Sequence, residues 1–317
     1  MPLPLILLLA VGLPTLLLLL CSYPLHRSPM AALCALYLRI ANPKRGEESA
    51  KRLLVRLGKR NGDRLPLPRA PRGVTVSEED FFGMQVLTFG TRADAERGIL
   101  YLHGGAYARP PRYHHLKFVG RLAKRSGLPV VMPLYPKAPH HTVLDVLPLL
   151  DRFYRTLTAR YRETVLMGDS SGGGLALSLL AHSPAMRTTP PRRAILLAPW
   201  VDITLKNPEI PRYERRDPLL SAAATRPLGL SFAAGLDPRD GRISPLFAEL
   251  AGLPPTDLFV GDRDLLFPDV CLLADRLRAA GVAVTLEAAR GMNHVYPIYP
   301  IPEARRALTN IVNKTLQ

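Results

Sequence analysis

The sequence of 317 residues contains only three cysteines, Cys21, Cys34 and Cys271, and they lie far apart. An odd number at this spacing excludes a disulfide framework and a CxxC metal pair. The chain has a single tryptophan, yet 47% of its residues are apolar and 21% are charged. This composition excludes a disordered chain and is sufficient for one large α/β domain with an appendage.

Residues 1–25 contain no charged side chain, and leucine dominates there. The segment is long enough to cross a bilayer as a helix. It shows neither a basic first region nor a small-x-small cleavage site, so we expect an uncleaved anchor rather than a signal peptide. A signal peptide, which would make the protein secreted, and a helix that packs on the protein itself are the alternatives.

Acidic residues are scarce: 26 Asp and Glu stand against 42 Lys and Arg, which gives a formal net charge of +16. More than half of this excess lies in residues 27–72, with twelve basic and three acidic residues. Basic residues after an apolar run keep the following domain cytoplasmic and attract anionic lipid. We therefore expect a membrane-associated protein. The basic stretch lacks interleaved aromatics and any nucleic-acid-binding motif, so nucleic acid is not expected as a partner.

Beyond residue 72, short apolar runs alternate with longer amphipathic stretches, the pattern of strands and helices in series. This order predicts an α/β fold with a mainly parallel sheet, right-handed crossovers and helices on both faces. The predicted strands cover residues 84–89, 98–102, 129–132, 164–167, 194–197, 257–260 and 282–286. The predicted helices cover residues 113–126, 143–161, 171–182, 268–280 and 303–316.

The segment from about residue 202 to residue 245 breaks this alternation. It is richer in proline and arginine and carries a helical patch over 219–224. We interpret it as a helical cap inserted over one edge of the sheet. The chain then divides into the apolar segment 1–25, a basic, helical linker or cap region over 26–72, and an α/β domain over 73–317 that contains the insertion.

A glycine-rich turn with the sequence GDSSGGG occupies residues 168–174, between a predicted strand and a predicted helix. In a G-x-S-x-G turn the serine backbone is strained and neighbouring elements approach closely, so glycine is needed on both sides. The hydroxyl of Ser170 is thereby exposed above the sheet. A phosphate-binding loop is the alternative, but neither a following Lys-Ser/Thr nor a GxGxxG is present.

A second glycine-containing turn, HGGAY at residues 103–107, follows the predicted strand 98–102. Glycines leave the backbone N–H groups of Gly104 and Gly105 uncovered. These groups can point at a developing oxyanion together with the N–H of Ser171. A tight turn without a function is the alternative.

A nucleophilic serine needs a base, and the base needs an orienting acid. In hydrolases with this turn the chain order is serine, acid, histidine. Of the eight histidines, only His182 and His294 follow Ser170. His182 lies in the helix that leads away from the serine, whereas His294 follows the last predicted strand. The sequence therefore predicts His294 as the base.

Two aspartates compete as the acid in the loop after the predicted strand 257–260. Asp264 lies further past the end of the strand, where the loop can meet His294. Asp262 is better placed to cap the turn. We predict Asp264 as the acid and assign Asp269 a structural role as the cap of the following helix.

These motifs together resemble the hormone-sensitive-lipase-like branch of the α/β hydrolases, also called the α/β-hydrolase fold-3 esterases. The resemblance rests on HGGAY, GDSSGG, the loop with Asp264 and the final GMNH, and covers about residues 74–312. It implies the α/β-hydrolase fold with a helical cap. In two places the sequence departs from the family: Ala106 replaces the third glycine of HGGG, and Leu265 replaces the proline of Asp-Pro-Leu.

The resemblance implies a serine carboxylesterase that hydrolyses acyl esters, with short chains such as acetyl expected, and that needs no cofactor or metal. Its partner would be a small-molecule or lipid-like ester. An amidase or formamidase with the same triad, and a receptor on the same scaffold, are the alternatives. The implied site residues are Ser170 as nucleophile, His294 as general base, Asp264 as its partner, Gly104, Gly105 and Ser171 as oxyanion donors, and His103 and Asp169 in support.

Overall fold

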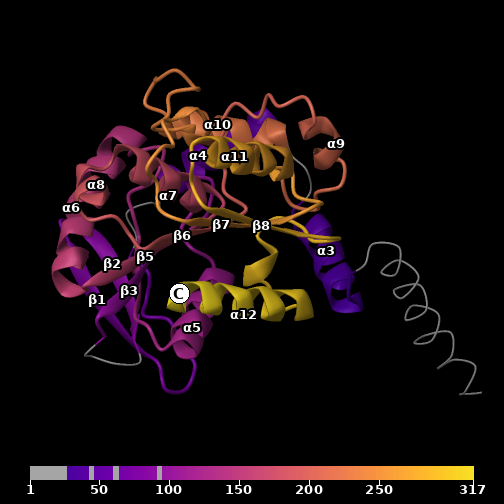
Figure 1. Ribbon diagram of the computed structural model, residues 1–317. Coiled ribbons are helices and arrows are strands. Elements are labelled where there is room, and N and C mark those ends of the chain that lie inside the picture. The colour runs from indigo at the N-terminus through magenta and orange to yellow at the C-terminus, as the bar shows by residue number, and fades with distance from the viewer. Residues whose placement is uncertain (1–26, 43–45, 60–63, 91–94) are drawn as a thin grey trace, which may run out of the picture.

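A single eight-stranded sheet forms the centre of the computed structural model, which describes residues 27–42, 46–59, 64–90 and 95–317 (Figure 1). The strand order is β1-β2-β4-β3-β5-β6-β7-β8. Strands β3 to β8 run parallel, and β1 and β2 are antiparallel to their neighbours. The strands are β1 (Thr75–Phe81), β2 (Met84–Gly90), β3 (Arg97–Leu102), β4 (Val130–Pro133), β5 (Glu163–Asp169), β6 (Arg193–Leu197), β7 (Thr256–Gly261) and β8 (Val284–Ala289).

Helices cover both faces of the sheet, as the alternating pattern predicts. Helices α5 and α12 pack together on one face, and α6, α7 and α11 cover the other (Figure 1). The fold is therefore the predicted α/β class with a mainly parallel sheet. The helices of this part are α5 (Tyr113–Ser126), α6 (Val143–Arg160), α7 (Ser171–His182), α8 (Pro184–Thr188), α11 (Phe267–Ala279) and α12 (Pro302–Leu316).

The central strands are apolar because both of their faces are covered. Every residue of β7 is buried, and β5 is buried from Thr164 onward. Near-continuous apolar runs are typical of parallel strands of this kind. Strand β1 was not predicted from the sequence, because its residues TVSEEDF are mostly exposed at the edge of the sheet. A two-residue turn, Phe82-Gly83, joins it to β2 with positive φ at both residues, the geometry of a tight hairpin.

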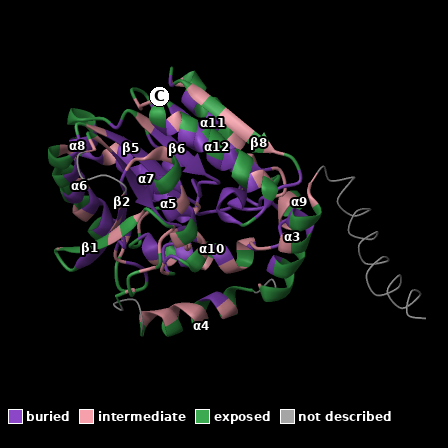
Figure 2. Cartoon of the chain, turned by 90° about the horizontal axis from the view of Figure 1, so that it is seen from below, coloured by how far each residue is buried: buried purple, intermediate pink, exposed green. Residues whose placement is uncertain are grey.

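Helices from two distant parts of the sequence lie over the carboxyl ends of the strands. The insertion contributes α9 (Ile210–Glu214) and α10 (Ala222–Phe232), and the basic N-terminal region contributes α3 (Pro29–Ala41) and α4 (Glu47–Gly58). Helix α4 packs against α10 and forms the outer layer in Figure 2. The predicted helical patch over 219–224 is wrong in its first half, because helix α10 begins only at Ala222.

The predicted anchor, residues 1–25, lies outside the described residues. Within the described part of the chain, no helix combines the length and the hydropathy that a membrane span requires. Cys34 and Cys271 are free thiols.

A buried ion cluster ties the sheet to the last helix. Asp257 on β7 is 1% exposed and lies 2.7 Å from Arg193 of β6 and 3.0 Å from Lys314 of α12. A carboxylate at this depth depends on such partners, because burial without them would cost several kcal/mol.

We predict that Asp257→Ala lowers the free energy of unfolding by about 3 kcal/mol, because Arg193 is left partly buried without its counter-charge. Equilibrium urea denaturation measures the change. The matched control is Asp275→Ala, which breaks an exposed pair with Arg278 and should cost less than about 1 kcal/mol. Equal losses in the two variants would contradict the prediction.

Candidate active site

Ser170 lies at the sharp turn between β5 and α7. Its φ of 53° places a non-glycine residue in the left-handed region, a strained conformation that exposes the side chain. A Cβ atom on Gly168 would overlap the backbone of Gly172, and one on Gly172 would overlap the backbone of Leu102. The two glycines of G-x-S-x-G are thus required by close backbone packing, as the motif predicts.

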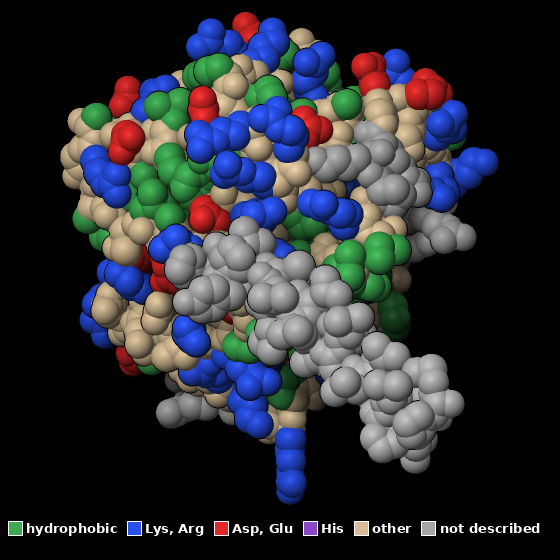
Figure 3. Space-filling view, turned by 90° about the vertical axis from the view of Figure 1, so that its right-hand side faces the viewer, with side chains coloured by type: hydrophobic (Ala, Val, Ile, Leu, Met, Phe, Trp, Pro, Cys, Tyr) green, Lys and Arg blue, Asp and Glu red, His purple; other side chains and the backbone are tan. Residues whose placement is uncertain are grey.

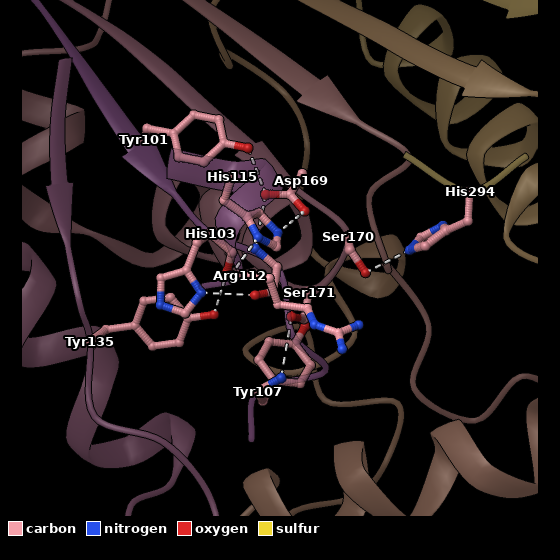
Figure 4. A network of polar contacts seen from close by, with 11 residues as sticks. Tyr101, His103, Tyr107, Arg112, His115, Tyr135, Asp169, Ser170, Ser171 and His294 are labelled. Carbon is pink, nitrogen blue, oxygen red and sulfur yellow. Dashed lines mark hydrogen bonds and ion pairs between the residues drawn. The ribbon is translucent and has the colours of Figure 1, made fainter. Parts of the chain in front are cut away.

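Ser170, His294 and Asp264 come together above the carboxyl ends of β5, β8 and β7. The Nε2 atom of His294 lies 2.9 Å from Oγ of Ser170, and its Nδ1 atom lies 2.8 Å from Oδ2 of Asp264. Figure 4 shows the Ser170 hydroxyl pointing toward the imidazole. The carboxylate is fully buried, whereas Ser170 is partly exposed. The three residues thus have the geometry of a proton relay.

The electrostatics of the site favour a basic imidazole. Burial alone would lower the pKa of His294, but the carboxylates of Asp264 and, in turn, Asp217 and Asp169 raise it above its ordinary value. A base with a raised pKa accepts a proton more readily during attack by the serine.

The two competing aspartates have other roles in the structure. Asp262 accepts a hydrogen bond of 2.7 Å from the N–H of Gly291 and so joins two loops, without reaching His294. The predicted capping role of Asp269 is wrong: helix α11 has no side-chain cap, and Asp269 instead accepts a hydrogen bond from Asn207. Burial raises the pKa of Asp269 to about 7.

The loop after β3 presents backbone amides beside Ser170, but not the pair that the sequence predicts. The N–H of Gly104 donates to Oδ1 of Asp169 at 2.9 Å, so it is already occupied. The N–H of Tyr107 donates to Oγ of Ser171. Between them, the amides of Gly105 and Ala106 have no acceptor in the described part of the chain.

Asp169 is the buried centre of a hydrogen-bond network (Figure 4). Besides the amide of Gly104, its carboxylate accepts from the hydroxyl of Tyr101 at 2.7 Å and lies 3.2 Å from Nε2 of His115. Burial alone would raise the pKa of Asp169, but His115 and the hydrogen-bond donors lower it overall. Tyr101 and His115 were not singled out from the sequence, because neither stands in a motif.

His103 supports the loop and stays away from Ser170. Its ring stacks on Tyr135 with centroids 4.6 Å apart, and its Nδ1 atom lies 2.8 Å from the carbonyl of Gly104. The hydroxyl of Tyr135 donates to the carbonyl of His103. Burial and the charge of Lys137 lower the pKa of His103 to about 3, so the ring is neutral at physiological pH.

Asp217 is a further buried carboxylate beside the loop of Asp264, and it was not predicted. Its Oδ2 atom accepts from the N–H of Leu265 at 2.8 Å, and its Oδ1 atom accepts from the N–H groups of Leu219 and Leu220. It therefore ties the inserted cap to the loop of Asp264. Burial and the charge of Asp264 raise the pKa of Asp217 to about 6. In the sequence, Asp217 stands before a proline and shortly before a helix, which is a common turn pattern. This pattern does not indicate a contact with the loop of Asp264.

A cavity of about 500 Å³ opens above Ser170 and His294. The N-terminal helices α3 and α4 wall it on one side, the inserted cap on another, and the loop after β3 on a third. Its apolar walls include Leu53 of α4, Leu228 of α10 and Trp200. Pockets of this size and lining bind small ligands.

We predict that Asp217→Asn lowers the pKa of His294, because the substitution removes a negative charge that stabilises the imidazolium. Titration of the imidazole by NMR measures the shift. Asp275→Asn, which removes an exposed charge on α11, serves as the matched control and should leave this pKa in place. An unchanged or raised value in Asp217→Asn would show that the Asp217 charge does not act on His294.

Comparisons of the sequence and of the structure with known proteins agree with each other. The sequence profile described as alpha/beta hydrolase fold matches residues 99–298. An acetyl-hydrolase of Streptomyces hygroscopicus is 32% identical over 217 residues, which are 67% of this chain and 73% of the relative. A crystal structure of a putative esterase from Staphylococcus aureus has a TM-score of 0.80 at 29% identity, and the match covers 86% of this chain and 93% of that one.

A second solved structure, an esterase from the bacterial hormone-sensitive lipase family, has a TM-score of 0.76 at 26% identity. The match covers 91% of this chain and 98% of that one. The Staphylococcus aureus structure reported above agrees with it in fold. The glycine turn of Ser170, the HGGAY loop and the strand order fit this group. The chain therefore belongs to the hormone-sensitive-lipase-like family of esterases with the α/β-hydrolase fold.

Proposed function

We propose that this protein is a serine carboxylesterase in which Ser170 is the nucleophile. The observation that carries the proposal is the unbroken hydrogen-bonded series from Oγ of Ser170 through His294 to Asp264, with contacts of 2.9 and 2.8 Å. Membership of an esterase family supports the same reaction.

In the proposed reaction, Oγ of Ser170 attacks the carbonyl carbon of the ester while its proton passes to Nε2 of His294. Asp264 stabilises the imidazolium that forms. The tetrahedral intermediate collapses, the C–O bond to the alcohol breaks, and the alcohol takes the proton from His294. Water then attacks the acyl-enzyme by the same route, which releases the acid and restores the serine.

The negative oxygen of the intermediate needs donors beside Ser170. We assign this role to the amides of Gly105, Ala106 and Ser171, in place of the Gly104 amide that Asp169 occupies. Ser171 is the first residue of α7, so its N–H has no partner within the helix. Ala106 has a φ of 54°, in the left-handed region, so the loop backbone turns at this residue. Such donors usually contribute more than a hundredfold in rate each.

We further propose that the acyl group is short. The cavity of about 500 Å³ is shared between the acyl and alcohol parts, and Trp200 and residues of the cap are among its walls. The similarity to the Streptomyces acetyl-hydrolase supports the same substrate class.

We predict that Ser170→Ala lowers kcat on p-nitrophenyl acetate by on the order of a millionfold, because the substitution removes the hydroxyl that attacks the ester. The variant should keep the wild-type circular dichroism spectrum. Release of p-nitrophenol measures the activity, and a fluorophosphonate probe should label wild type but not the variant. Labelling or full turnover in Ser170→Ala would contradict the assignment of the nucleophile. A faster reaction on the matched anilide would identify an amidase instead.

We also propose that residues 1–25 attach the protein to a membrane, with the catalytic domain on the cytoplasmic side. The helix that follows them, α3, exposes large apolar side chains: Met30 is 52%, Tyr37 65% and Ile40 72% exposed. Deletion of residues 1–25 should move the protein from the membrane fraction, resistant to carbonate washing, to the soluble fraction. Persistence of the truncated chain in the membrane fraction would contradict attachment through this segment.

A further inference from the structure

The charges around the active-site cavity are almost all positive. Three arginines line it: Arg56 of α4, Arg109 of the loop after β3, and Arg112 at the start of α5. Among the described lining residues the one carboxylate is Asp169, which is already engaged by its hydrogen-bond donors. The cavity therefore presents positive charge to a ligand with no free negative charge on its lining to balance it.

Two of these arginines lack a counter-charge among the residues that the structure describes. Arg56 and Arg112 form no ion pair with any carboxylate in the described parts of the chain, and both are exposed at the rim. Arginines elsewhere on the surface do find partners, as Arg155 does with Asp151 and Arg278 with Asp275. The face shown in Figure 3 is also rich in Lys and Arg side chains.

Arg112 lies on the side of the cavity where the reaction takes place. Figure 4 shows its side chain extending from the Asp169 network toward Ser170. Arg112 and His114 both belong to the lining of the cavity that contains Ser170. Guanidinium groups bind phosphate and carboxylate through paired N–H donors.

The walls behind the arginines are apolar. Leu53, Leu220 and Leu228 line the cavity from α4 and the cap, and Trp200 is 1% exposed. A ligand that fits both surfaces has an apolar part and an anionic part. In the acyl-enzyme mechanism the alcohol leaves first and water enters after it, so the alcohol part lies toward the mouth, where the arginines are.

We propose that the preferred substrates are esters of short acyl groups with alcohols that carry a phosphate or a carboxylate, bound at the rim by Arg56 and Arg112. This inference rests on the proposed esterase function and names its substrate class. The arginines select the substrate through its charged group and do not touch the reacting bond.

The test compares two matched pairs of esters. The phosphate pair is 1-butanoylglycerol-3-phosphate and 1-butanoylglycerol, and the carboxylate pair is butanoyloxyacetate and ethyl butanoate. Butyrate release gives kcat/KM for each ester. The ratio of charged to neutral ester should be about ten or more at low salt in at least one pair and should fall as salt screens the attraction. The pair with the larger ratio identifies the anion.

Variants then assign the preference to the two arginines. Arg56→Gln and Arg112→Gln should each lower the ratio about threefold, as for exposed ion pairs, and the double variant about tenfold. The matched control is Arg187→Gln on α8, an exposed arginine outside the cavity lining, which removes the same charge and should leave the ratio unchanged. Circular dichroism checks that each variant is folded.

Two results would overturn the inference. A ratio of one or less in both pairs, with the neutral esters hydrolysed, would reject the charged substrate class and leave the esterase function intact. A preference that survives in the double variant would reject the role of these arginines. If no ester of either pair were hydrolysed by wild type, the proposed function and the inference would both fail.

Discussion

The carboxylate of Asp169 fixes the relative positions of the serine turn, the loop after β3 and helix α5. It lies at the end of β5, directly before Ser170, and receives donors from β3, from the loop after β3 and from α5. A buried charge with this many donors is stable only while all of them stay in place. The serine turn and the loop with the free amides are therefore fixed relative to each other before any substrate binds, which is the preorganisation that electrostatic stabilisation requires.

A second buried carboxylate, Asp217, likewise links separate parts of the site. Asp217 joins the inserted cap to the backbone of Leu265, next to Asp264. The N–H of Leu266 in turn donates to Oδ1 of Asp264, which leaves Oδ2 for His294. The position of the acid thus depends on the cap as well as on the sheet. The same carboxylate adds negative charge near the imidazole and so influences its basicity.

Much of the fold was predictable because its signals are local. The buried strands are apolar runs, and the predicted limits of α5 and α7 agree with the structure. Strand β1 gave no such signal, since a polar edge strand is defined by its partner and not by its own sequence. The meeting of Ser170 and His294 was predictable from their order and their places after strands.

What the sequence could not reveal were contacts that depend on how remote segments meet. Nothing in HGGAY indicates that the first glycine amide is taken by Asp169, which moves the free pair to Gly105 and Ala106. The contact of Asp217 with the acid loop spans 48 residues of sequence and has no motif. The cluster of arginines around the cavity likewise combines α4 with the start of α5.

The packing of α4 on α10 joins two segments that lie far apart in the sequence. One wall of the cavity comes from residues that precede the α/β domain, and another comes from an insertion within it. If the insertion alone were exchanged between two esterases, the two walls of the cavity would no longer fit each other. A working chimera would have to carry both segments, and the loop of Asp264 would have to accept the aspartate of the insertion that binds it.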